Sequence, residues 1–308
     1  MTAPLRVGTR GSPLALAQTE EALTRLRAAH PDLAFETVEI QTHGDEEYRE
    51  DLGTPLDGKR AFTKRIEEAL LDGRVDFAVH SLKDVPADLD PALEIAAVPE
   101  RADPRDVLVA NDGLSLHHMP PGARIGTSSL RRKAQLLAEW PRLEIVELHG
   151  NVGTRLRRLD AKAFDGVVVA AAGLGRLGVG DRRPVPLPPE VLTPAPGQGA
   201  LALECRASNA TIHDLLRSIE DRTARAETDA ERALSARLGG GCNVPFGALA
   251  TLEQGFLTLR AVVASPDGRR IARAAAQAPA ESHRETVDRV AARLLESGAE
   301  EILREAAA

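Results

Sequence analysis

Two kinds of hydrophobic pattern alternate along the first two thirds of the chain. Short apolar or β-branched runs predict buried strands at residues 5–9, 35–40, 75–80, 93–98, 143–148, 166–172 and 200–205. Segments of helical periodicity lie between them. One helix is predicted to begin at Pro13 after the N-cap Ser12, and others cover residues 63–71, 130–139 and 152–160. This alternation predicts an α/β fold with mainly parallel sheets, in which ligands bind at the carboxyl ends of the strands.

The last third of the chain has a different pattern. A proline-rich segment at 182–199 interrupts the alternation, and a helix is predicted at 222–238. Amphipathic strands at 246–253, 256–265 and 270–278 follow, with Pro266-Asp267-Gly268 as a turn between the last two. The terminal helix carries an apolar stripe of Val287, Val290, Ala291, Leu294 and Leu295. These patterns predict a separate, small α+β domain over residues 220–308.

Composition narrows the class of protein. With 308 residues, 43% of them apolar, the chain is expected to form two or three globular domains. The net charge of −7 means that any anion site must be a local cluster of Lys and Arg. The N-terminal stretch has no long apolar run, so we expect neither a secretion signal nor a membrane span. The two cysteines lie in no CxxC spacing, which favours free thiols in the cytoplasm and no metal site.

Cations and hydroxyls cluster in three loops that follow predicted strands. These loops read GTRGS (8–12), GTSSLRRK (126–133) and HGNVGTRLRR (149–158). Helix N-termini bind anions, whereas basic side chains there oppose the helix dipole, so helix stability does not explain the arginines. Each loop alone is expected to be a solvated helix face. Three loops at equivalent positions predict a shared anion-binding cleft.

The stretch VHSLKDVP (79–86) brings His80, Lys83 and Asp84 to the end of a strand. An aspartate before Val-Pro is often only a turn former. A carboxylate beside a lysine at this position can also move protons or orient a cation. Asp84 is therefore the candidate catalytic carboxylate.

The two cysteines have different surroundings. Cys242 directly follows three glycines in LGGGCNVPFG (238–247), where the backbone can approach a bound group closely, so we expect Cys242 to hold or react with something. Cys205 ends an apolar strand and is expected to be a buried structural residue. The GLGRLG stretch (173–178) matches a dinucleotide fingerprint, but the acidic residue about twenty positions later is missing, which argues against a dinucleotide site.

Together these stretches resemble the porphobilinogen deaminase (hydroxymethylbilane synthase) family. The matching pieces, in the family's order, are GTRGSPLALAQ, AVHSLKDVP, RADPRDVLV, GTSSLRR, GNVGTRL, AAGLGRLG, PAPGQGALALECR, ERA and GGGCNVPFG. The resemblance implies two doubly wound, solute-binding-protein-like α/β domains with mainly parallel sheets plus a small C-terminal α+β domain. The expected boundaries are 1–98 with 199–218, 103–193, and 220–308.

The resemblance also implies an activity. A transferase of this family joins four porphobilinogen molecules head to tail, loses ammonia each time and releases hydroxymethylbilane by hydrolysis, in tetrapyrrole (heme) biosynthesis. The chain would grow on a dipyrromethane cofactor held by a thioether bond to Cys242. The expected partners are porphobilinogen and its oligopyrrole intermediates, with no nucleic acid and no membrane, and the expected form is a cytoplasmic monomer.

Site residues carry over by motif position. Asp84 would stabilise positive charge and pass protons. The residues that would hold the cofactor's carboxylates are Lys83, Ser129, Arg131, Arg132 and Arg155. Hydroxyl or backbone contacts to the cofactor would come from Thr127, Ser128, Gly150 and Asn151. Incoming substrate would bind Arg10, Ser12, Gln18 and Arg176.

Two departures from the family's pattern stand out. The loop before FTK is shorter than expected and leaves Lys59, Arg60 and Phe62 as candidate lid residues. His149 stands where the family has arginine, and it is a further candidate cofactor-binding residue.

Two other classes remain open from the residues. A two-lobed anion-binding protein without catalysis would share the fold, but it would have no reason for Cys242 in a glycine loop. A nucleic-acid binder would fit the basic loops, but neither the net charge nor the 3% aromatic content.

Overall fold

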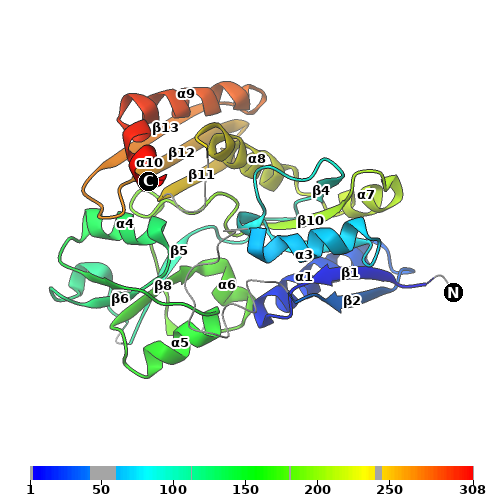
Figure 1. The fold of residues 1–308 in the computed structure, drawn as a ribbon, viewed down its shortest axis with the longest axis horizontal. Helices are drawn as coiled ribbons and strands as arrows, with labels where there is room; N and C mark the ends of the chain where they lie inside the picture. Colours follow the sequence, from blue (N-terminus) through cyan, green and yellow to red (C-terminus); the bar gives the residue numbers. More distant parts are fainter. Residues whose placement is uncertain (1–2, 42–59, 112, 180–181, 240–244, 308) are drawn as a thin grey trace. The chain divides into compact units, whose positions relative to one another are not determined.

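The computed structural model describes residues 3–41, 60–111, 113–179, 182–239 and 245–307, with the side chains of 60–62 and 306–307 left out (Figure 1). The chain divides into two compact units. The first consists of Met1–Ala102 and Gly199–Arg225, and the second of Asp103–Gln198 and Ala226–Ala308. The second α/β segment and the C-terminal segment thus share one unit, and their division into separate domains stays a prediction.

The first unit is built on a five-stranded sheet. Its order is β2 (Phe35–Glu39), β1 (Leu5–Thr9), β3 (Phe77–Ser81), β10 (Leu201–Arg206) and β4 (Leu93–Ala97). Strand β1 pairs in parallel with β2 and β3, whereas β10 is antiparallel to both of its neighbours. The sequence pattern predicted all five strands to within two residues of their observed ends.

Helices cover both faces of this sheet. Helix α1 (Pro13–Ala29) begins at the predicted cap, where Ser12 Oγ accepts a hydrogen bond from Ala15 N at 3.3 Å. Helices α1 and α7 (Ala210–Arg217) share one apolar cluster with the sheet. Helix α3 (Arg60–Leu71) packs on the other face through Ile66 and Leu70. The periodicity missed α7, which has only eight residues.

The second unit contains a five-stranded sheet of the same layout. Its order is β7 (Glu144–Val146), β6 (Arg124–Gly126), β8 (Gly166–Ala170), β5 (Asp106–Ala110) and β9 (Val185–Pro186). Strand β6 is parallel to β7 and β8, and β5 is antiparallel to β8 and β9. Both sheets are therefore mixed, with one antiparallel strand next to a parallel core.

Helices also cover the sheet of the second unit (Figure 1). Helix α4 (Leu130–Glu139) packs on one face through Leu136. Helices α5 (Val152–Asp160) and α6 (Ala171–Arg176) pack on the other face. The predicted bounds of α4 and α5 are confirmed.

The C-terminal part is an antiparallel sheet of β11 (Phe246–Glu253), β12 (Phe256–Ala264) and β13 (Ile271–Pro279). One face shares an apolar core with residues of α8 (Arg222–Arg237), α9 (His283–Glu296) and α10 (Ala299–Ala307). The predicted α9 stripe is buried except for Leu295. That part of the prediction is wrong, because the Leu295 side chain lies on the exposed side of the helix.

The turn between β12 and β13 approaches α4 closely. Gly268 lies there in the left-handed region, with φ of +71°, and a Cβ atom at this position would stand 2.5 Å from Ala134 O. Arg273 of β13 also donates from Nη2 to Glu139 at 3.1 Å. Among the described residues, no helix has the length and apolar character needed to span a membrane.

Candidate active site

A pocket opens at the carboxyl ends of β1 and β3 in the first unit. Its lining includes Arg10, Ser12, Gln18, Thr63, His80 and Asp84. The structure thus brings together the three predicted substrate residues of this unit and the candidate catalytic carboxylate. Ligands of open α/β sheets bind at this edge of the sheet.

Local structure places each of these groups. Gln18 on α1 donates from Nε2 to Ser81 Oγ at 2.7 Å, which holds its amide against the end of β3. Asp84 ends a single 3₁₀ turn, Leu82–Asp84, and is only half-buried. Its carboxylate forms no hydrogen bond or ion pair with any described residue, so its oxygens are available to a bound molecule. Lys83 lies beside it on the same turn.

One residue that lines the pocket, His80, contacts a second carboxylate. The Nε2 atom of His80 lies 3.0 Å from Glu204 Oε2, and both side chains are buried. His80 stands in the predicted stretch VHSLKDVP without a predicted role, and Glu204 was not predicted as a site residue. No local pattern could have revealed the pair, because its members are 124 positions apart.

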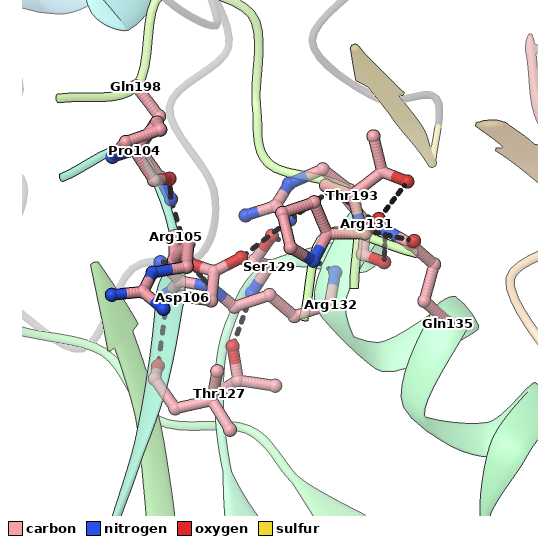
Figure 2. Close-up of polar contacts among 12 residues, drawn as sticks. Pro104, Arg105, Asp106, Thr127, Ser129, Arg131, Arg132, Gln135, Thr193 and Gln198 are labelled. Atoms are coloured by element: carbon pink, nitrogen blue, oxygen red, sulfur yellow. Dashed lines mark hydrogen bonds and ion pairs between the residues drawn. The ribbon is translucent and has the colours of Figure 1, made fainter. Parts of the chain in front are cut away.

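The second unit holds a buried cluster of charges between α4 and β5 (Figure 2). Arg131 donates from Nη1 to Asp106 Oδ2 at 2.7 Å, and Arg132 donates from Nη2 to Asp106 Oδ1 at 2.8 Å. Burial alone would raise the pKa of Asp106, but the charges and hydrogen bonds of the two guanidinium groups hold it well below its usual range. Arg131 and Arg132 are both 6% exposed, so the alternative interpretation of this loop as a solvated helix face does not hold for them.

Three further residues support the cluster. Gln198 donates from Nε2 to Asp106 Oδ1 at 3.0 Å. The carbonyl oxygen of Thr193 accepts hydrogen bonds from Arg131 Nη1 and Gln135 Nε2. Asp106, Gln198 and Thr193 were not predicted as site residues, although the first two lie in the family-like stretches RADPRDVLV and PAPGQG.

The charge of the cluster suits an anionic ligand. Two guanidinium groups and one carboxylate leave a net charge of +1 in a buried position. Among the described residues, Arg131 donates only from Nη1, so Nε and Nη2 remain available for a ligand. A carboxylate is one of the anions that an arginine fork binds bidentately. The residues present therefore fit a cofactor that carries carboxylates.

Hydroxyl groups order the loop in front of α4. Ser129 Oγ accepts from Arg132 N at 3.4 Å and caps the helix, and Ser129 N donates to Thr127 Oγ1 at 3.2 Å. Ser128 Oγ accepts from Arg155 Nη2 at 3.1 Å. The structure therefore brings the predicted GTSS and GNVGTR loops together, while their contacts with a cofactor stay predictions.

The second of these loops is shaped by Gly150 and Asn151. Gly150 has a φ of +107° and its carbonyl oxygen accepts from Arg155 Nε at 2.8 Å. Asn151 Oδ1 accepts from Thr154 N at 2.9 Å and caps α5. His149 Nε2 lies 2.9 Å from Glu147 Oε1 in an exposed pair.

The remaining predicted residues are placed less fully. Arg176 ends α6 in the second unit and is half-buried. Arg60 and Phe62 lie in the first turn of α3, but their side chains are not described. Cys242 and Lys59 lie outside the described residues.

Cys205 is fully buried in the core of the first unit, as predicted. Burial raises the pKa of its thiol to about 12, and the nearby charges of Glu94 and Glu204 act in the same direction. A thiol in this state is not a nucleophile at neutral pH.

Fold and sites together define the class of this protein. It is an α/β protein with two five-stranded mixed sheets of the same layout and a C-terminal antiparallel sheet, and it carries a carboxylate-bearing pocket and a buried cationic cluster. The family model described as "Porphobilinogen deaminase, dipyromethane cofactor binding domain" matches residues 5–214. The model for the C-terminal domain of the same family matches residues 226–296. The chain belongs to the porphobilinogen deaminase family.

Curated relatives match over almost the whole chain. The porphobilinogen deaminase of Desulforudis audaxviator is 48% identical over 297 residues, which cover 96% of each chain. That of Chromobacterium violaceum is 46% identical with the same coverage. Among solved structures, a probable amino-acid ABC transporter extracellular-binding protein from Bacillus subtilis is 14% identical. It has a TM-score of 0.45 and covers 78% of this chain and 99% of its own.

Proposed function

We propose that this protein is a porphobilinogen deaminase. It joins four porphobilinogen molecules head to tail on a covalent dipyrromethane primer, with loss of ammonia at each step, and releases hydroxymethylbilane by hydrolysis. The observation that carries the proposal is the buried cluster of net charge +1, with unused donors on Arg131, in the domain matched to dipyrromethane binding. A protein that binds anions without catalysis is not favoured, because almost the whole chain matches an enzyme family.

The chain's own residues divide the work of binding. Arg131, Arg132 and Ser129 hold cofactor carboxylates in the second unit, supported by Arg155. Lys83 serves the same purpose in the first unit. A charge-assisted hydrogen bond contributes about 1.5–3 kcal/mol, so a few such contacts hold a polycarboxylate firmly. When bound, the dipyrromethane supplies the pyrrole carbon to which the first substrate unit is joined.

The pocket of the first unit orients the substrate. Arg10 pairs with a substrate carboxylate, and Ser12 and Gln18 supply neutral hydrogen bonds beside it. The Asp84 carboxylate pairs with none of the described residues, so it can accept hydrogen bonds from pyrrole N–H groups and stabilise positive charge as ammonia leaves. Cys242 attaches the primer through a thioether bond.

An intact-mass measurement of the purified protein tests the proposal. The wild type should exceed its sequence mass by two pyrrole units, and Cys242→Ser should lose both this excess and turnover. Cys205→Ser is the matched control, because the buried thiol is not a nucleophile, and it should keep the adduct. An adduct on Cys242→Ser, or none on the wild type, would overturn the proposal. We also propose that the protein is a cytoplasmic monomer. Light scattering tests the oligomeric state, and cell fractionation tests the location.

A further inference from the structure

His80, which lines the pocket beside Asp84, forms a buried pair with the carboxylate of Glu204, and the proposed function assigns this pair no role. The side chains of His80 and Glu204 are 4% and 1% exposed, and Nε2 lies 3.0 Å from Oε2. The two residues come from β3 and β10, which are antiparallel neighbours, and Glu204 stands opposite Ala78, two positions before His80. The pair is therefore fixed by the register of the sheet.

This pair is an unfavourable way to fill a core. Glu204 Oε1 is buried and has no hydrogen-bond partner among the described residues. A buried carboxylate oxygen without a donor is destabilising, and apolar residues of similar volume often replace buried ion pairs without loss of stability. Stability therefore does not explain the pair, which points to a role in chemistry.

The geometry leaves one ring nitrogen for that chemistry. His80 also lines the pocket. Since Nε2 is engaged by Glu204, Nδ1 is the ring nitrogen left to exchange a proton. A carboxylate on one ring nitrogen orients the imidazole and compensates the positive charge that forms when the other nitrogen takes a proton.

We infer that His80 is a proton acceptor for the reaction in this pocket and that Glu204 is its positioning residue. The inference rests on the proposed function. At each condensation, the bond between the aminomethyl carbon of porphobilinogen and its protonated nitrogen breaks, and the electron pair leaves with ammonia. A carbon–carbon bond forms to a pyrrole carbon, which then loses its proton. His80 Nδ1 takes this proton and passes it to the departing ammonia, which leaves as ammonium.

The charges around the pocket agree with two separate tasks. Arg10 comes from the loop after β1, Asp84 from the 3₁₀ turn and Glu204 from β10, whereas α1 and α3 contribute the uncharged Gln18 and Thr63. Asp84 has no partner in the part of the chain that the structure describes, so its charge can stabilise positive charge on the substrate. His80 has a carboxylate of its own, so it can accept a proton without withdrawing Asp84 from that task.

Steady-state kinetics between pH 6 and 9 test the inference on the loaded protein. His80→Gln should lower kcat by about 10²–10⁴-fold, the range for general acid–base groups, with KM little changed and the rising limb of the kcat–pH profile lost. Glu204→Gln keeps the shape of the pair and should lower kcat by a smaller factor. His117→Gln, which changes an exposed histidine of the second unit, is the matched control and should behave as wild type.

Two further measurements separate chemistry from structure. Intact mass should show a normal primer on both variants, and added imidazole should restore turnover to His80→Ala. The inference would be overturned by any of three results. These are a kcat of His80→Gln within about threefold of wild type at every pH, loss of the primer from either variant, or no rescue of a folded His80→Ala by imidazole. A wild type without primer or turnover would instead defeat the proposed function. An active wild type with an unaffected His80→Gln defeats only the role of His80.

Discussion

Asp106→Asn tests whether the buried cluster is organised by charge. The substitution keeps the shape of the side chain but leaves Arg131 and Arg132 buried without their counterion. At an effective dielectric constant of 20, charges about 4 Å apart attract by about 4 kcal/mol, and Asp106 has two such partners. The relieved desolvation of Asp106 offsets part of this attraction. Measured losses for broken buried pairs are about 3–5 kcal/mol, which is the loss of unfolding free energy we expect.

The chain offers a clean assay for this loss. Its single tryptophan, Trp140, follows α4 in the same unit, so tryptophan fluorescence during urea unfolding reports on the unit that contains Asp106. The control is Asp103→Asn, which breaks a partly exposed pair with Arg105 and should cost less than about 1 kcal/mol. Because the pKa of Asp106 is lowered in the folded protein, its carboxylate contributes to the free energy of unfolding above the pKa of the unfolded chain, about 3.9. This contribution is lost as pH falls below that value. The difference from wild type should therefore shrink below about pH 4.

A second substitution separates charge from packing. Adding Arg131→Gln to Asp106→Asn returns the cluster to its original net charge and should recover part of the lost stability. The reasoning fails if Asp106→Asn lowers the free energy of unfolding by less than about 1 kcal/mol. It also fails if the double variant is less stable than Asp106→Asn alone.

Two other predictions follow from the described contacts. Gly268→Ala should cost about 2–5 kcal/mol, because it combines a left-handed φ with a Cβ placed 2.5 Å from Ala134 O. Gly255→Ala shares the positive φ but meets no described atom within 4 Å, so it should cost only about 1–2 kcal/mol; equal losses in urea unfolding would show that the approach to α4 does not matter. The pKa of the Cys205 thiol is raised in the folded protein. The contribution of this thiol to the free energy of unfolding is therefore complete below its pKa in the unfolded chain, about 8.5, and is lost as pH rises through about 12. Above pH 9 the free energy of unfolding of the wild type should therefore fall by about 1.4 kcal/mol per pH unit more than that of Cys205→Ala. Unfolding followed by circular dichroism measures this difference, and equal pH dependence of the two proteins would contradict the prediction.

Local pattern was sufficient for most elements of the fold. The first-unit strands and helices α1, α4 and α5 follow from apolar periodicity and caps. The pattern missed β6, which has three residues, and β5, which begins with the charged Asp106. In the sequence, a charged residue at the start of a strand looks like a loop residue, because the two arginines that neutralise Asp106 lie 25 and 26 positions away.

The candidate sites were predictable only in part. Motifs placed Arg10, Ser12, Gln18 and Asp84 correctly in one region, because residues near strand ends converge at one edge of a sheet. The partners of buried groups were not predictable. Glu204 reaches His80 through sheet register, and Gln198 reaches Asp106 across 92 positions.

The strand order of the first unit constrains how the chain can fold during synthesis. Strand β10 lies between β3 and β4 and is the only described strand that pairs with β4. About a hundred residues of the second unit are made after β4 and before β10, which takes roughly 5–20 s at about 5–20 residues per second. During that interval β3 exposes an unpaired edge and β4 has no partner in the sheet. Unpaired edges are templates for aggregation, so the nascent first unit is a natural client for chaperones until the chain returns to it.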